Sequence, residues 1–543
     1  MKTTVIFASL VLLASSAAFG ATYVEYQGPN GNLNVPGNWY VITDPGDPAS
    51  RTGATRLPVK GGTLGSMDDG DSAIVRNATT TTINTAMEAG RWYISGPTVT
   101  VGSPPAGPTT VYLLSGGTMS LRSDGFDTDM GGARLYVGQR YTGTFNQQAG
   151  YVHTSGRLDS GVIVGSASGG TGVYNLTGGT LHLTDPFAGI PQLLVGHTVG
   201  AYGQFNQSGG LVKLDGDRVI DKCIQIGHGT RGEYNLSGGS VSSLMWTVVG
   251  TRTEIPGGTS GNSFGTGIVT QTGGTFSGYS YRMTVGDNNL EGDGNIGHYK
   301  LLGGTLGCPV PIVATTDSGH IWLGRGAGGT GGTGVGKLTI AQGAKCNTTG
   351  FANIADGTAP RADASQVELK INSTSAFDWT TAYWLDWDGA LEVSFTGGYA
   401  PAVGTDWKIM TGPADHLYGV NFAPGIITPG FSVDVRDVTG GHEVHLVYNA
   451  ARHSGDANND GAVNVGDLGI LAGNWQQVTA LGKRWEEGDF TGDDVVNVGD
   501  LGVLAGAWGW TGTPVPPPPG QVPEPASLAL LALGGLLAAR RKR

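Results

Sequence analysis

A repeat of about thirty residues fills the middle of the chain and limits the folds open to it. In each clear copy an aromatic residue precedes Asn, two further residues, a pair of small residues and a β-former. Clear copies lie at 145–150, 174–179, 205–210 and 234–239, with weaker ones at 112–117, 269–274 and 299–304. The first small residue falls at 116, 149, 178, 209, 238, 273 and 303. Because one such unit cannot bury its own apolar face, the units must stack.

A second block precedes several copies and adds strands to each unit. It consists of apolar residues that end in Gly, at 135–138, 162–165, 193–196 and 224–227. Each unit thus holds two or three short strands separated by glycines. The sequence therefore predicts a mainly β fold, a parallel β-solenoid (β-helix) over residues 106–364, with equivalent residues about 4.8 Å apart along its axis. A β-propeller is the alternative, although about 40 residues per blade is usual.

Composition agrees with this class and excludes others. Of 543 residues 96 are Gly, and Gly costs roughly 0.5–1 kcal/mol relative to Ala in a helix, so long helices are disfavoured. No Gly-X-Y period suggests collagen, and 39% hydrophobic residues suffice for a core. A net charge of -12 makes nucleic acid a poor partner. Cys223, Cys308 and Cys346 are too few and too scattered for a disulfide framework.

The repeated Asn has two interpretations. Asn175, Asn206 and Asn235 each begin Asn-x-Ser/Thr, the acceptor pattern for glycosylation. Their fixed place in the repeat favours stacked asparagines in turns, with side chains that bond to the backbone. We assign no glycosylation.

Both ends of the chain carry export signals. Lys2 precedes an apolar run at 5–13, and small residues at 18–20 fit a signal-peptidase site, so residues 1–20 are predicted to be a removed signal peptide. At the other end a Pro-rich linker, 512–521, leads to a short motif, a 14-residue apolar stretch and four basic residues. The motif is Val522, Pro523, Glu524 and Pro525. At about 1.5 Å per residue the apolar stretch reaches about 21 Å, less than a bilayer core of about 30 Å.

This order over residues 522–543 closely resembles the PEP-CTERM sorting signal of Gram-negative bacteria. The resemblance implies an exosortase that recognises the motif, transient membrane association through the C-terminal helix, and removal of that helix. It places the protein at the cell surface, in the outer envelope or in a secreted matrix.

Regions on either side of the solenoid are predicted to close its ends, as solenoids require. Residues 21–105 are expected to form an N-terminal β cap, and residues 365–450 a C-terminal β-rich cap with alternating strands at 391–395 and 442–448. These segments resemble the opening and closing segments of autotransporter-like repeat proteins.

Two twelve-residue loops give the strongest chemical signal. Calcium prefers 6–8 oxygen ligands at about 2.3–2.6 Å, which a loop can supply from positions 1, 3, 5, 7, 9 and 12, with Gly at position 6 for the turn. In the first loop these positions hold Asp456, Asn458, Asp460, Ala462 (through its carbonyl), Asn464 and Asp467, with Gly461 at position 6. In the second they hold Asp489, Thr491, Asp493, Val495, Asn497 and Asp500. Asp494 replaces the glycine, which makes the second calcium site the less certain prediction, although Asp adopts positive φ more readily than most residues.

Each loop continues into a predicted helix, at 468–475 and 501–508. In the first, Leu468, Leu471, Ala472 and Trp475 are expected to form one apolar face. The duplicated pair at 453–511 resembles the type I dockerin, which implies a small α-helical domain with paired calcium loops and a cohesin-like partner. In that family loop positions 10 and 11 help to select the cohesin, often through hydroxyl residues. Val-Gly at 465–466 and 498–499 departs from that pattern.

These features favour an exported, modular, non-catalytic solenoid with a structural, adhesive or polysaccharide-binding use and a calcium-dependent docking module. The alternative is a β-helix polysaccharide lyase or glycoside hydrolase, which needs acids clustered with a basic group on neighbouring coils. The clear repeats contain no such cluster. His197 and His228 are expected to stack on adjacent coils, and Trp379, Trp384 and Trp387 to pack in the core or cap more readily than to bind sugar.

Overall fold

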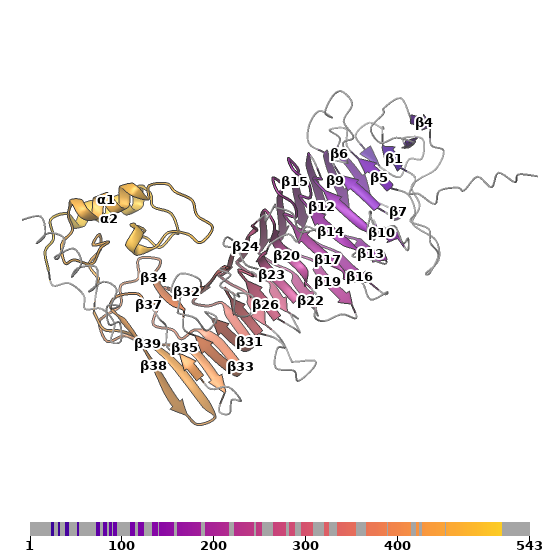
Figure 1. Ribbon diagram of the computed structural model, residues 1–543. Helices are drawn as coiled ribbons and strands as arrows, with labels where there is room; N and C mark the ends of the chain where they lie inside the picture. The colour runs from indigo at the N-terminus through magenta and orange to yellow at the C-terminus, as the bar shows by residue number, and fades with distance from the viewer. Residues whose placement is uncertain are drawn as a thin grey trace, which may run out of the picture.

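The computed structural model has the form of a long β stack with two short helices beside one end (Figure 1). The predicted signal peptide, the sorting segment and nearly all of the Pro-rich linker lie outside the described residues. The structure describes residues 23–26, 31–32, 39–42, 51–53, 72–75, 80–83, 86–89, 91–94, 109–113, 118–123, 133–139, 141–156, 160–185, 190–216, 222–243, 246–251, 264–277, 282–287, 295–307, 320–324, 334–353, 365–387, 389–413, 420–422, 426–450 and 452–512.

Three ladders of parallel strands run along the stack, and each full rung supplies one strand to each ladder. The first ladder contains β2 (Gly31–Asn32), β6 (Thr80–Ile83), β9 (Thr109–Leu113), β12 (Thr142–Gln147), β15 (Thr171–Leu176), β18 (Tyr202–Gln207), β21 (Arg231–Leu236), β24 (Thr266–Gln271), β27 (Ile296–Leu301), β30 (Val335–Ala341), β32 (Ser365–Ile371), β34 (Ala390–Phe395) and β37 (Ile426–Ile427). The second contains β7 (Ala86–Ala89), β10 (Thr118–Ser123), β13 (Tyr151–Gly156), β16 (Thr180–Asp185), β19 (Leu211–Gly216), β22 (Ser240–Ser243), β25 (Thr275–Ser277) and β28 (Thr305–Gly307).

The third ladder contains β1 (Tyr23–Tyr26), β5 (Ser72–Val75), β8 (Arg91–Ile94), β11 (Arg134–Val137), β14 (Gly161–Val164), β17 (Gln192–Val195), β20 (Lys222–His228), β23 (Trp246–Thr251), β26 (Arg282–Val285), β29 (His320–Leu323) and β36 (Val420–Phe422). The long strands β31 (Lys345–Asn353) and β33 (Asp378–Trp387) extend the second and third ladders together. The pairing is parallel and, in the clear repeats, without a register shift, which confirms the predicted β-solenoid and excludes the radial blades of a propeller.

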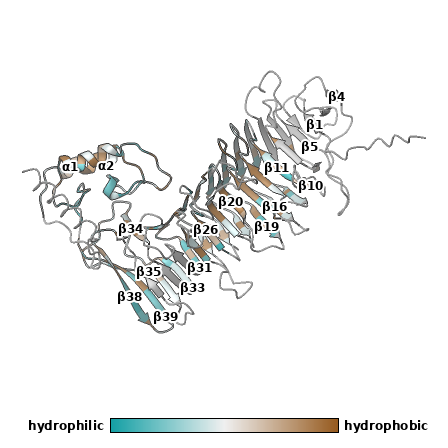
Figure 2. Cartoon of the chain, in the orientation of Figure 1, coloured by the Kyte–Doolittle hydropathy of each residue, from teal (hydrophilic) through white to brown (hydrophobic). Residues whose placement is uncertain are grey.

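The aromatic residue of the repeat points inward and stacks on its equivalents. Tyr174, Phe205 and Tyr234 are fully buried, and their ring centroids are 4.7 and 4.8 Å apart, the distance between strands. Each buried Tyr hydroxyl is satisfied by a Gln of the preceding rung; Tyr234, for example, donates to Gln207 Oε1 at 2.6 Å. The brown apolar segments in Figure 2 run through the strands in the middle of this stack.

The prediction that the repeated asparagines lie in turns and bond to the backbone is wrong. Asn175, Asn206 and Asn235 lie within strands, not in turns, and each donates its side-chain amide to the amide oxygen of the Asn one rung earlier, at 2.7–2.9 Å. The parallel register places their side chains directly above one another, so a ladder of side chains replaces the expected bonds to the backbone.

Close contact between rungs explains much of the glycine content. A Cβ on Gly232 in β21 would lie 1.9 Å from the carbonyl oxygen of Val195, and one on Gly172 would lie 2.1 Å from that of Val137. Both distances are far below van der Waals contact, so strand glycines are required where the first ladder turns against the third.

The parallel pairing extends beyond the predicted solenoid boundaries. Residues before 106 already form parallel strands, and after residue 364 β32 pairs with β30, and β34 with β32. Antiparallel pairing among the described strands occurs in β3 (Trp39–Ile42) and β4 (Arg51–Gly53) near the N-terminus and in β35 (Asp406–Pro413), β38 (Phe431–Val438) and β39 (Gly441–Tyr448) near the C-terminus.

Candidate functional site

The two predicted loops form one compact module of duplicated parts. The helices α1 (Val465–Gly473) and α2 (Val498–Ala507) begin within the loops, three residues earlier than the sequence predicts, and the 3-10 helix η3 (Trp485–Glu487) lies between them. The module has its own small core, in which Leu471 and Leu504 are buried at 1% exposure. Ala472 and Trp475 are exposed, so the predicted apolar face of α1 is wrong at these two positions; Leu468 and Ile470 pack against the core.

Each loop is closed by the segment that follows the opposite helix. Gly509, after α2, donates to the carbonyl oxygen of Val463 in the first loop, and Gln476, after α1, donates to that of Val496 in the second, each at 2.9 Å. The two loops are thereby tied to each other, and the module behaves as one folded unit.

Buried carboxylates organise the first loop. Asp456 Oδ2 accepts the Gly461 N–H at 3.0 Å, and Asp467 accepts the N–H groups of Ala457 at 2.8 Å and Asn464 at 2.9 Å. Asp467 and Asn464 form a capping box at the N-terminus of α1, which explains why the helix begins there. Acidic residues at positions 1 and 12 are therefore held with their oxygens toward the loop.

The second loop repeats this arrangement and brings three carboxylates together. Asp500 accepts the N–H groups of Phe490 and Asn497, each at 2.8 Å, while Asp489 Oδ2 accepts that of Asp494 at 2.8 Å. One carboxylate oxygen from each of Asp489, Asp493 and Asp500 lies within 4.8 Å of the other two. Within the part of the chain that the structure describes, no other group of three His, Cys, Asp or Glu side chains meets this criterion.

The remaining predicted ligands lie around these carboxylates. Thr491 Oγ1 is 3.1 Å from Asp500 Oδ1, and the Asn497 amide donates to Asp493 Oδ2 at 2.9 Å and to the Val495 carbonyl oxygen at 3.1 Å. Burial, with added repulsion from the neighbouring acids, raises the pKa of Asp489 to about 6. The loop is thus a concentration of oxygen atoms with negative charge that a cation of calcium's size would neutralise.

In the first loop the carboxylate oxygens do not come together as closely as those of the second loop. The Asn458 amide donates to Asp460 Oδ2 at 2.9 Å, and the Ala462 N–H donates to Asp460 Oδ1 at 2.9 Å. Position 6 has φ of 87° at Gly461 and 74° at Asp494, so both loops make the same left-handed turn there.

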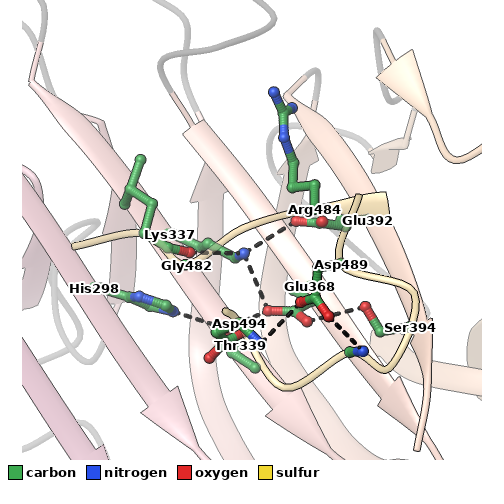
Figure 3. A network of polar contacts seen from close by, with 12 residues as sticks. His298, Lys337, Thr339, Glu368, Glu392, Ser394, Gly482, Arg484, Asp489 and Asp494 are labelled. Atoms are coloured by element: carbon green, nitrogen blue, oxygen red, sulfur yellow. Dashed lines mark hydrogen bonds and ion pairs between the residues drawn. The ribbon is translucent and has the colours of Figure 1, made fainter. Parts of the chain in front are cut away.

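A group of charged residues that the sequence did not reveal lies under the second loop. The outward column of the first ladder that carries the asparagines continues along the register as Thr270, Lys300, Thr339, Glu368 and Glu392. We call the charged residues at this end of the ladder the seam; they are His298, Lys300, Lys337, Glu368, Lys370 and Glu392. Residues between 480 and 494 of the module contact the seam, and Figure 3 labels His298, Lys337, Glu368, Glu392 and Asp494.

Ion pairs connect neighbouring rungs within the seam. Lys337, at 1% side-chain exposure, lies 3.1 Å from Glu368 Oε2 and 3.0 Å from Glu392 Oε2. Burial alone would lower the pKa of Lys337, but the two carboxylates outweigh it and raise that pKa. Burial raises the pKa of Glu392 to about 7 in spite of Lys337, whereas Lys337 and Lys370 overcome burial and lower the pKa of Glu368.

The His and Trp residues singled out in the sequence stack on one another or pack in the core where the structure describes their side chains. The rings of His197 and His228 stack on adjacent coils with centroids 5.0 Å apart, as predicted. Trp379 is buried in the core at 1% exposure, which confirms core packing for that residue; the side chains of Trp384 and Trp387 lie outside the described residues. Cys223 and Cys346 are buried, and the Cys223 thiol lies 3.2 Å from Ser243 Oγ.

Comparison with known proteins identifies the C-terminal end of the chain. Residues 521–543 match the model of the PEP-CTERM protein-sorting motif. No curated protein and no solved structure matches the chain. The motif indicates a protein of a Gram-negative bacterium that is exported, sorted by an exosortase and associated with the cell surface. In the described part of the chain no helix is both long enough and apolar enough to cross a bilayer.

Proposed function

We propose that the protein is a non-catalytic solenoid of the bacterial cell surface whose paired-loop module binds two calcium ions and docks a partner. The observation that carries the calcium proposal is the convergence of Asp489, Asp493 and Asp500 within a loop whose remaining positions also offer oxygens. Bound calcium would supply charge neutralisation and a rigid loop; it has no part in any reaction proposed for the chain.

The residues present fit calcium better than a transition metal. The second loop offers carboxylates, a hydroxyl and a carbonyl, all hard oxygen donors, and neither loop contains His or Cys. Asp489, Thr491, Asp493, Val495, Asn497 and Asp500 would hold one ion. Asp456, Asn458, Asp460, Ala462, Asn464 and Asp467 would hold the other.

Exposed apolar residues beside the loops support docking of a partner. Val465 and Val498, at position 10 of the two loops, are 73% and 74% exposed, and glycine follows each of them. The duplicated Val-Gly pair presents small apolar patches at the N-termini of both helices. A cohesin-like protein with an apolar surface is the proposed partner, and the outward solenoid columns remain available for polysaccharide.

The seam is the one observation that favours an enzyme. Glu368, Glu392 and Lys337 lie on neighbouring rungs, as the acids and base of a polysaccharide lyase or hydrolase would. Each of these side chains, however, is engaged in an ion pair, and the module covers them. A screen of the mature protein against polysaccharides tests this alternative. Cleavage of a polysaccharide by the wild type that is lost in the Glu368→Gln variant would favour an enzyme.

Calorimetric titration of calcium-free mature protein tests the calcium proposal. We expect two binding events and a rise in melting temperature with calcium, because an ion that binds the folded state alone stabilises it. Asp500→Ala should remove one event and Asp467→Ala the other. Absence of both events in the wild-type protein would contradict the proposal.

A further inference from the structure

The two loops differ at position 6, and the difference has an energetic cost. Gly461 adopts its φ of 87° freely, whereas Asp494 holds a side chain at φ of 74°. The left-handed region disfavours most residues other than Gly by about 1 kcal/mol or more, and Asp by less, so an interaction that holds the Asp494 side chain would offset this cost.

Two lysines from the solenoid provide that interaction. Asp494 Oδ2 is 2.7 Å from Lys300 Nζ, and Asp494 Oδ1 is 3.0 Å from Lys370 Nζ. Asp494 is only 13% exposed, so this ion pair is largely shielded from solvent. Because Lys300 and Lys370 come from β27 and β32, the carboxylate spans strands of separate rungs.

Backbone groups of the module reinforce the contact. Lys370 Nζ also donates to the carbonyl oxygen of Gly492, position 4 of the second loop, at 3.1 Å. Lys337 donates to the carbonyl oxygen of Leu481 at 3.0 Å, and His298 Nδ1 is 2.8 Å from that of Ala480. The solenoid therefore holds positions 4 and 6 of the second loop and the segment that leads to it.

We propose that the seam is an intramolecular docking surface and that the second calcium site is energetically coupled to it. Calcium in the second loop orders positions 4 and 6 in the conformation that the lysines bind, and the docked lysines in turn favour that conformation. Coupling of this kind is reciprocal, so docking strengthens calcium binding by the same factor by which calcium strengthens docking. The inference rests on the proposed calcium function and gives the second loop a further role, because this loop fastens the module to its own solenoid.

Calcium titration of the full mature chain, combined with hydrogen exchange of residues 479–494, tests this coupling. In the Lys300→Ala/Lys370→Ala protein we expect the affinity of one calcium site to fall about fivefold or more and that of the other to stay unchanged. The segment should exchange slowly in the calcium-loaded wild type, faster after chelation, and fast under both conditions in the double variant. Lys345→Ala removes an exposed lysine whose pairing with Asp378 lies outside the seam, and serves as the matched control.

Asp494→Gly separates docking from folding of the loop. It restores the glycine of position 6, so we expect it to bind two calcium ions while residues 479–494 exchange fast. Two sites of unchanged affinity in the lysine variant, with exchange that is insensitive to calcium, would overturn the inference and leave the calcium proposal intact. Absence of calcium binding in the wild type would overturn both.

Discussion

At the scale of single residues, parallel stacking places equivalent side chains of successive repeats above one another, so that they form columns along the axis. Gln207 shows the consequence for buried polar groups: its amide donates to the carbonyl oxygen of Ser240 at 3.0 Å, and its oxygen accepts the Tyr234 hydroxyl. Along this interior column Gln147, Gln207 and Gln271 alternate with leucines, and each Gln oxygen accepts a Tyr hydroxyl from the next rung, so its burial is tolerated.

Removal of one hydroxyl tests this account. Tyr234→Phe leaves Gln207 Oε1 buried without its donor, and we expect the free energy of unfolding to fall by about 1–3 kcal/mol. Denaturant unfolding of the variant measures the loss, and Tyr151→Phe, which removes an exposed hydroxyl bonded to His182 Nδ1, serves as the control for an exposed hydrogen bond. Equal stability of the two variants would show that the column contributes nothing.

At the scale of elements, the strands were predictable and the seam was not. The aromatic-Asn-Gly-Gly pattern places strands β12, β15, β18 and β21 because the alternation of buried and exposed residues is local. The seam depends on which residues of β27, β30, β32 and β34 lie above one another. Spacings there are irregular: Lys300 pairs with Thr339, 39 residues later, and Glu368 with Glu392, 24 residues later.

In the loops, too, one part could be predicted from the sequence and another could not. The amino-acid sequence alone predicted all twelve candidate ligand positions, because calcium loops follow a fixed spacing. The partner of Asp494 was hidden, since Lys300 lies 194 residues away in the sequence. The one available signal was the Asp at position 6 of the second loop, where the first loop has Gly461.

Glu392 makes the stability of the folded chain depend on pH, and the direction of this dependence follows from its pKa. Its pKa is raised to about 7 by burial, against Lys337, with Glu368, Glu486 and Arg452 also nearby. Because the folded chain binds this proton more tightly than the unfolded chain, the stabilisation is complete below about pH 4.5 and is lost as pH rises through about 7.

We therefore expect the melting temperature of the wild type to fall by a few degrees more than that of Glu392→Gln between about pH 5.5 and about pH 8. Thermal unfolding of both proteins at constant ionic strength and calcium concentration measures the difference. An identical pH dependence would show that Glu392 does not hold a proton at the seam.

At the scale of the whole molecule, the fold joins a long β stack to a small module that we propose to be ordered by calcium. The stack buries one continuous core along its axis, whereas the module has a core of few residues and carries its acidic groups in two loops. The sorting motif indicates that the protein is exported and associated with the cell surface. The central claim is therefore calcium in both loops of a module docked on a parallel solenoid.

A crystal structure of the mature protein grown with calcium, with anomalous data collected at long wavelength, tests that claim most directly. We predict one anomalous peak in each loop, with oxygen ligands at about 2.3–2.6 Å, and Asp494 in contact with Lys300 and Lys370. Loops without a peak at saturating calcium, or a module detached from the seam, would contradict it.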